Sequence, residues 1–288
     1  MENLGVSSDF LKDEDVVKIL TNKEVVDTIK KYEKYEGNAA KEIADKIAKA
    51  AYYLRDEKAV TEIARTIGKY EGKVAEEIAD KIAEAAYKFR NEVDEVIKIC
   101  KILTMDDVVN TVRKYEGWVA VNIAGRIAYA AYEFRNKDEV IKISKILGMD
   151  EIVNTVRKYE DDAAQIVAHY IACAAYEFRN EVDEVIKISK ILGMDDVVNT
   201  VRKYEGWVAV NIADRIAYAA YEFRNEVDEV IKISKILTMD DVVNTIGKYE
   251  DDAAGEIAGK IAYAAYEFRN EVDEVIKISK ILGMDEIV

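Results

Sequence analysis

An internal repeat of about 45 residues constrains this chain more than any other feature of its sequence. The tripeptide Lys-Tyr-Glu recurs with its tyrosine at positions 70, 115, 159, 204 and 249, in steps of 45, 44, 45 and 45 residues. Segments 91–135 and 180–224 are identical at 42 of 45 positions. A unit of this size cannot bury both faces of a long helix alone, so the repeat predicts units that stack on their neighbours.

Each unit is expected to form three helices. The 288 residues include no proline, the residue that most often breaks a helix because it lacks an N–H and clashes with the preceding turn. Apolar residues at helical spacing predict helices over 180–193, 194–206 and 207–225. The third is the longest and richest in alanine, so we expect it to be the central packed helix of each unit.

The helix ends are expected at particular polar residues and glycines. In the unit that starts at Asn180, this residue is a candidate N-cap and Gly193 a candidate stop for the first helix. We expect Asp195 or Asp196 to cap the second helix, which would end near Gly206. No break requires proline.

These patterns predict an all-α fold, specifically a right-handed α-solenoid of about six three-helix repeats in one domain over residues 1–288. The second unit lacks about ten residues of its first helix, and the last unit is incomplete. The units are 13–55, 56–90, 91–135, 136–179, 180–224 and 225–269, with a partial unit at 270–288.

Three helices in about 45 residues resemble armadillo repeats and, more loosely, HEAT repeats. The resemblance lies in the period and the helix count. Armadillo repeats commonly bind extended peptides through asparagines of the third helix. Asn122 and Asn211 stand on that helix at matching positions, and the other units carry Glu42, Glu77, Ile166 and Glu256 there. The resemblance implies a protein- or peptide-binding surface.

The repeats differ mainly on one face of the third helix. Its positions are spaced by three and four residues, which places them on one stripe. In the first two units this stripe carries Glu and Lys, with expected pairs such as Glu42–Lys46 and Glu77–Lys81 on a solvated face. Later units carry aromatic residues, arginine and asparagine. The aromatic residues and arginine are typical of interface hot spots. The candidate binding residues are Trp118, Asn122, Arg126, Tyr129, Ile166, His169, Tyr170, Trp207, Asn211, Arg215, Tyr218, Lys260 and Tyr263.

The variation on this face also fits three origins unrelated to binding, all of which stay open. Exposed positions can drift at random, and gene conversion can copy whole repeats. Aromatic residues can also pack between repeats, and we favour this packing for Trp118 and Trp207, which stand at a helix start. Against drift, lysines that look exposed do not vary in the later copies. They are Lys114, Lys158, Lys203 and Lys248, and Lys142, Lys187, Lys232 and Lys277.

Charge and motifs exclude several classes of function. With 42 basic and 57 acidic residues, the net charge of −15 argues against nucleic acid and anionic membranes as partners. There is no phosphate-binding loop, dinucleotide motif, metalloprotease motif or nucleophile elbow, so we expect no enzyme activity and no cofactor. Cys100 stands where other units carry serine, which predicts a buried filler. One histidine, His169, cannot form a two-histidine metal site.

The sequence therefore predicts a non-enzymatic scaffold that binds a protein or peptide. The alternative is a structural protein that stacks or forms homo-oligomers through a C-terminal end without a polar capping repeat. The N-terminus carries no secretory signal and the thiols are few, which favours the cytoplasm. The scarcity of glutamine, with abundant Glu, Lys, Ile and Val, resembles thermophile usage.

Overall fold

The computed structural model describes residue 6 and residues 10–35 and 38–284, and this part of the chain is α-helical and contains no strand. Contacts between helices divide the chain into two compact units, Met1–Gly148 and Met149–Val288. The division falls inside the repeat 136–179, between its first and second helices. The single domain expected from the sequence stays a prediction.

The N-terminal unit has two layers of helices. The long helices α3, α5 and α8 pack against one another in chain order, and the shorter helices form the second layer, where α2 contacts α4, α4 contacts α6 and α7 contacts α9. The elements are the 3-10 helix η2 (Phe10–Lys12), α1 (Glu14–Leu20), α2 (Lys23–Lys31), α3 (Ala39–Leu54), α4 (Glu57–Ile67), α5 (Gly72–Lys88), α6 (Val93–Leu103), α7 (Asp106–Val112), α8 (Gly117–Phe134) and α9 (Lys137–Leu147).

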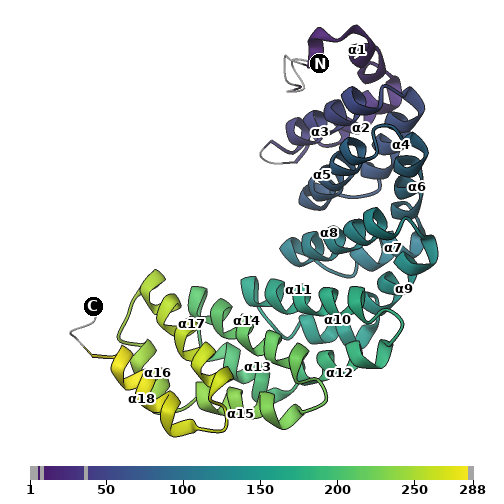
Figure 1. The fold of residues 1–288 in the computed structure, drawn as a ribbon. Coiled ribbons are helices and arrows are strands. Elements are labelled where there is room, and N and C mark those ends of the chain that lie inside the picture. The colour runs from purple at the N-terminus through teal and green to yellow at the C-terminus, as the bar shows by residue number, and fades with distance from the viewer. Residues whose placement is uncertain (1–5, 7–9, 36–37, 285–288) are drawn as a thin grey trace. The chain divides into compact units, whose positions relative to one another are not determined.

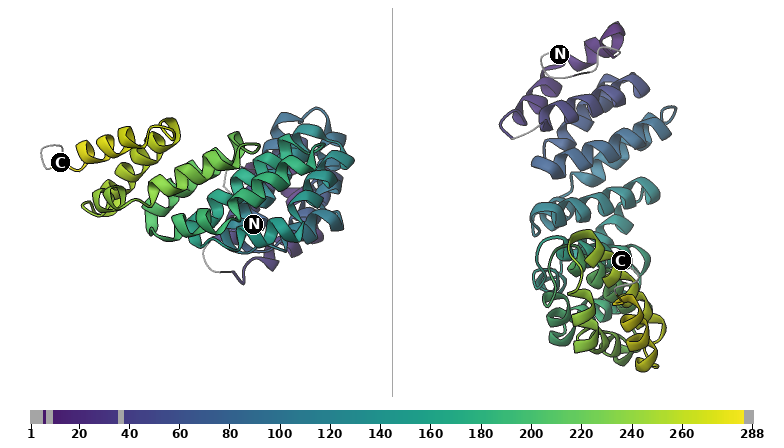
Figure 2. Two further views of the ribbon diagram at one scale, coloured as in Figure 1. Left: turned by 90° about the horizontal axis from the view of Figure 1, so that it is seen from below. Right: turned by 90° about the vertical axis from the view of Figure 1, so that its left-hand side faces the viewer.

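The C-terminal unit repeats this arrangement. The long helices α11, α14 and α17 lie side by side, and the second layer pairs α10 with α12, α13 with α15 and α16 with α18 (Figure 1 and Figure 2). The elements are α10 (Asp150–Val156), α11 (Asp161–Glu177), α12 (Val182–Leu192), α13 (Asp195–Arg202), α14 (Gly206–Glu222), α15 (Val227–Leu237), α16 (Asp240–Ile246), α17 (Asp251–Glu267) and α18 (Val272–Leu282).

The expected apolar stripes form the core. Ile212, Ile216 and Ala220 of α14 are at most 1% exposed, and so are Val185 and Ile188 of α12. Small residues bring the long helices close together. A Cβ atom on Gly255 of α17 would lie 3.0 Å from the Cβ of Trp207, and one on Gly259 would lie 3.2 Å from Oδ1 of Asn211.

The tyrosine of the Lys-Tyr-Glu repeat joins each repeat to the next. The hydroxyl of Tyr70 donates to the carbonyl of Leu103 at 2.6 Å, and that of Tyr159 donates to the carbonyl of Leu192 at 2.5 Å. The same bond recurs for Tyr32, Tyr115, Tyr204 and Tyr249. Each tyrosine thereby satisfies a carbonyl at the C-terminus of the following first helix, where carbonyls have no partner within the helix. Burial raises the pKa of Tyr159, so its hydroxyl stays protonated as a donor.

The Phe-Arg-Asn segment at the end of each long helix forms a second junction. The guanidinium of Arg224 lies 4.4 Å from the ring centre of Phe178 in the preceding repeat, and its Nε donates to Oε2 of Glu184 at 2.7 Å. Arg269 makes the equivalent contacts with Phe223 and Glu229. The ring contacts with Phe178 and Phe223 join successive repeats, whereas the charge-assisted bonds to Glu184 and Glu229 close each repeat on itself.

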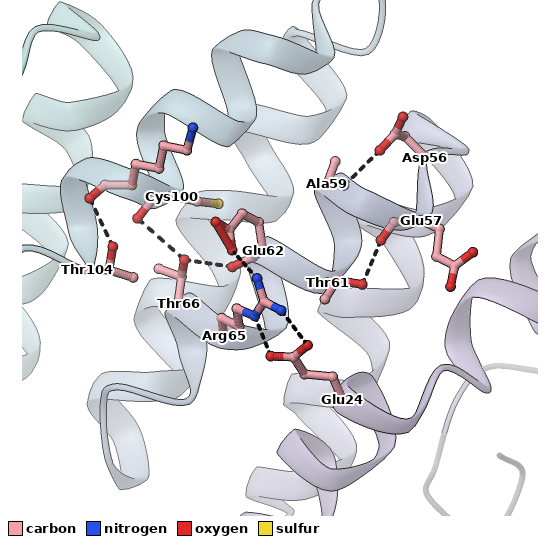
Figure 3. A network of polar contacts seen from close by, with 11 residues as sticks. Glu24, Asp56, Glu57, Ala59, Thr61, Glu62, Arg65, Thr66, Cys100 and Thr104 are labelled. Carbon is pink, nitrogen blue, oxygen red and sulfur yellow. Dashed lines mark hydrogen bonds and ion pairs between the residues drawn. The ribbon is translucent and has the colours of Figure 1, made fainter.

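The shortened second unit has one short helix, α4, before its long helix α5, where the other units have two. Helix α4 contacts α2 on one side and α6 on the other, so it takes the place of both short helices. Figure 3 shows the polar contacts that accompany this packing: Arg65 pairs with Glu24 of α2, and Thr66 donates to the carbonyl of Cys100 in α6 at 3.4 Å. Cys100 is 1% exposed, and burial raises the pKa of its thiol to about 12, which confirms the buried filler.

The predicted helix caps are wrong by one to a few residues. Asn180 precedes α12, whose N-cap is Glu181, and Gly193 is the C-cap with a negative φ. Asp195 begins α13 instead of capping it, because Met194 occupies the N-cap position. Gly206 begins α14 with a φ of +53° instead of ending α13.

A left-handed residue of this kind makes the sharp turn at the start of α5, α8, α11, α14 and α17. Gly72, Gly117 and Gly206 adopt it at little cost, because glycine has no Cβ to clash with the carbonyl oxygen. Asp161 and Asp251 adopt it in two other repeats with φ of +44° and +47°. Aspartate is among the few other residues that tolerate this conformation, which explains the Gly/Asp exchange at this position.

We predict that Tyr159→Phe destabilises the protein by about 1–3 kcal/mol, because the buried carbonyl of Leu192 loses its donor while the ring packing is kept. Equilibrium urea unfolding followed by circular dichroism measures the change. Tyr263→Phe serves as the control, because its side chain is largely in water. Equal stability of both variants and the parent would contradict a structural role for the repeated tyrosine.

Candidate functional site

The predicted binding residues fall on four long helices in two units. In the N-terminal unit, α8 carries Trp118, Asn122, Arg126 and Tyr129. In the C-terminal unit, α11 carries Ile166, His169 and Tyr170; α14 carries Trp207, Asn211, Arg215 and Tyr218; and α17 carries Lys260 and Tyr263. Since α11 packs on α14 and α14 on α17, the second group lies on one continuous set of helices.

Several of the aromatic side chains are exposed. Trp118 and Trp207 are 57% and 60% exposed, and Tyr263 and Tyr129 are 51% and 39% exposed. The expectation that the two tryptophans pack between repeats is therefore wrong.

The middle of the stripe lies in the seam between successive long helices. Nζ of Lys46 on α3 pairs with Asp80 on α5, and the hydroxyl of Tyr170 on α11 lies 3.1 Å from Oδ1 of Asp214 on α14. In both contacts a residue of one long helix meets a residue of the next helix that lies one position before its own equivalent, since Lys81 and Arg215 are the equivalents of Lys46 and Tyr170. Asn122, Arg126, Ile166, Tyr170, Asn211 and Arg215 are accordingly half-buried. Only part of the stripe is available to a partner.

The expected pairs within the early helices are replaced by other contacts. Lys46 pairs with Asp80 of the next helix and not with Glu42, and Lys81 pairs with Glu84 and not with Glu77. Glu77 is half-buried, and a Cβ on Gly125 of α8 would lie 2.6 Å from its Oε1. Burial raises the pKa of the Glu77 carboxyl. The early face is thus not simply solvated.

Aromatic rings continue from helix to helix in the C-terminal unit. The rings of Tyr170 and Tyr218 are 6.4 Å apart, and those of Tyr218 and Tyr266 are 5.4 Å apart. The guanidinium of Arg215 lies 5.2 Å from the ring centre of Tyr263. These distances are typical of aromatic and cation–π contacts. Tyr218 is half-buried, so the aromatic contacts on this face combine packing with exposure.

His169 and Cys173 form a polar pair on α11. Their Nε2 and Sγ atoms are 3.5 Å apart, and His169 is exposed. The two residues are one turn apart, which places them on the same helix face. Among the described residues, no group of three or more His, Cys, Asp or Glu side chains is arranged to hold a metal ion.

The lysines that do not vary have structural partners. Nζ of Lys248 donates to the carbonyl of Gly283 at 2.7 Å, and Nζ of Lys187 donates to Glu184 and Asn225 at 2.6 and 2.7 Å. Similar bonds are made by Lys114, Lys158, Lys203, Lys142, Lys232 and Lys277. Their constancy follows from these contacts, so it does not separate a binding face from drift.

Two exposed tyrosines are absent from the residues predicted from the sequence. Tyr52 and Tyr87 are 43% and 57% exposed on the early helices, where the stripe itself carries Lys49 and Glu84. Every long helix has a tyrosine at their position, so the repeats show no variation there. Their exposure depends on how the neighbouring helix packs. A residue that is the same in every repeat gives no sequence signal of such a difference in exposure.

Two grooves lie at the N-terminal ends of the long helices in the C-terminal unit. One is lined by Asp161, Arg202 and Glu205 between α11 and α14. The other is lined by Trp207 and Asp252 between α14 and α17. Trp207 therefore stands at the edge of a depression with an acidic rim.

No family model and no curated protein matches this sequence. In the part of the chain that the structure describes, no helix is long and apolar enough to cross a membrane.

We predict that Glu77→Gln stabilises the protein at neutral pH. The raised pKa means that folding favours the protonated carboxyl, so the ionised form lowers stability at neutral pH, and the amide removes this cost. The difference from the parent should shrink as pH falls through the raised pKa. Thermal unfolding from pH 7 to pH 3 measures it.

The control is Glu84→Gln, which removes an exposed carboxylate on the same helix. It should leave stability unchanged or slightly reduced, because exposed ion pairs contribute little. A Glu77→Gln protein that is less stable than the parent at neutral pH would contradict the burial cost.

Proposed function

We propose that the chain is a right-handed α-solenoid of about six three-helix repeats, similar to armadillo and HEAT repeats, that acts as a non-enzymatic scaffold for a protein or peptide. Within each unit, successive long helices pack in chain order, and the same tyrosine bond recurs from repeat to repeat. Both features support a repeat architecture in which each repeat contacts its neighbours.

The exposed aromatic side chains on the long helices are the main support for binding. Trp118, Trp207 and Tyr263 are each more than half exposed. Tryptophan and tyrosine dominate protein interfaces because they bury a large area at low cost in side-chain entropy. The sequence divergence of the stripe adds no support. The invariant lysines have structural partners, so their constancy no longer argues that the stripe diverged for binding and not by random drift.

The layout of the C-terminal unit favours an extended partner. Trp207 and Tyr263 lie on neighbouring helices, with Tyr170, Tyr218 and Arg215 in the seams. A partner that crosses α11, α14 and α17 would meet an apolar ring or a polar side chain on each helix. A peptide could thus contact several helices at once, as partners of repeat proteins do on their extended surfaces.

We predict that replacing Trp118, Trp207 and Tyr263 with alanine weakens peptide binding at least about tenfold, since each side chain has the character of a hot spot. Random dodecapeptides displayed on phage are selected on the parent protein, and fluorescence anisotropy gives the Kd of each enriched peptide for parent and variant. Circular dichroism verifies that helical content is unchanged.

The matched control replaces exposed lysines of the short-helix layer, Lys101 and Lys190, with alanine. This control should bind like the parent. Failure to enrich any peptide, or equal loss of binding in the control, would contradict the proposed face.

Helix α18 supports a second candidate, self-association. Its sequence Val-Asp-Glu-Val-Ile-Lys-Ile-Ser-Lys-Ile-Leu is identical to α12 and α15. Ile191 and Ile236 are 2% and 1% exposed in those helices, whereas the equivalent Ile281 is 51% exposed. Helix α12 contacts the long helix α14, and α15 contacts α17. The proposed occupant on α18 is the same face of a second copy, in a twofold contact.

We predict that the weight-average mass from light scattering rises with concentration toward that of a dimer, because paired α18 faces remove isoleucine and leucine from water. Ile281→Lys should abolish the rise, whereas Val227→Lys, an exposed apolar residue elsewhere, should not. A mass that stays monomeric at all concentrations would exclude self-association.

A further inference from the structure

Arg215 of α14 is enclosed by aromatic rings. Its guanidinium lies 5.6 Å from the ring centre of Tyr218, 5.2 Å from that of Tyr263 and 5.8 Å from that of Tyr266. Its Nε is buried and has no hydrogen-bond partner. A buried donor without a partner is costly, so the arrangement favours an acceptor supplied from outside.

Two of the equivalent side chains in other repeats have a partner on the next long helix, whereas Lys81 pairs with Glu84 of its own helix. Lys46 pairs with Asp80, and Tyr170 contacts Asp214. For Arg215 the corresponding residue of α17 is Gly259, which has no side chain to offer. The glycine therefore leaves the guanidinium without the acid that the seam provides elsewhere.

No acidic side chain of the described residues forms an ion pair with Arg215. Asp214 is the partner of Tyr170, and the carboxylate of Glu267 acts on Tyr263, whose pKa it raises.

We propose that Arg215, with Tyr218 and Tyr263, forms a subsite for the carboxylate of an aspartate or glutamate side chain in the bound peptide. This inference rests on the proposed binding function. A guanidinium presents parallel N–H donors that match a carboxylate, and partial removal from water strengthens such a bond. The tyrosine rings would contact the aliphatic part of the acidic side chain. Lys260, exposed on α17, adds positive charge on the same stripe.

A substitution at Gly259 tests the subsite directly. Gly259→Asp restores the carboxylate found at this position in other repeats, so it should pair with Arg215 and exclude the ligand. Gly259→Asn adds the same volume without charge. In both variants the new Cβ lies 3.2 Å from Oδ1 of Asn211, a side-chain atom that can move by a few tenths of an ångström.

The probe is N-acetylglutamate N-methylamide, with N-acetylglutamine N-methylamide as its neutral analogue, titrated into ¹⁵N-labelled protein. The Nε–H signal of Arg215, assigned by its absence in Arg215→Lys, reports binding. We expect the glutamate probe to bind the parent and Gly259→Asn at least about tenfold more tightly than the glutamine probe. Gly259→Asp should bind neither, while Lys46→Ala, which removes a paired cation, should behave like the parent.

Equal shifts with both probes, no shift with either, or glutamate binding that survives Gly259→Asp would overturn the subsite. Selected peptides distinguish this failure from failure of the scaffold function. If peptides bind the aromatic face without needing an acidic residue or Arg215, the scaffold stands and the subsite falls. If the glutamate probe binds while no peptide is enriched, the subsite stands and the scaffold function falls.

Discussion

The structure depends on burial of the alanine- and isoleucine-rich faces of the long helices against one another. Each such helix has apolar residues on more than one side, so a single repeat would leave part of them in water. Alanine and glycine at the contacts let the helix backbones approach closely, as Gly255 and Gly259 do beside Trp207 and Asn211. Close approach excludes water, and polar groups at the junction then need partners within the protein.

The repeated tyrosine and arginine meet that need. The hydroxyl of Tyr159 satisfies a carbonyl at the end of α12, and Arg224 connects α14 to both Phe178 and Glu184. Each of these bonds joins a repeat to its neighbour or closes the repeat on itself. The constancy of the tyrosine and the arginine in the sequence therefore reflects the geometry of stacking. The same reason accounts for the constancy of the lysines that donate to carbonyls at the ends of the first helices.

Because the variable stripe lies at a seam, the character of the surface is decided by pairs of residues. Lys46 is neutralised because α5 offers Asp80, whereas Arg215 is not because α17 offers Gly259. A substitution on one helix thus changes the chemistry of the surface beside it on the neighbouring helix.

The sequence alone determined the helical class, the repeat period, the shortened second unit and the buried position of Cys100, because periodicity and composition act locally along the chain. It did not assign the N-caps, since Glu181 and Met194 occupy them without a side-chain cap hydrogen bond and so carry no capping signal in the sequence. Only the tertiary structure decided which side chains meet water. Trp207 is exposed although its Cβ lies close to Gly255 of α17, Glu77 lies against α8, and Ile281 is exposed although Ile236 in an identical helix is buried. Exposure depends on the neighbouring helix, and the residues that contact one another there are far apart in the sequence.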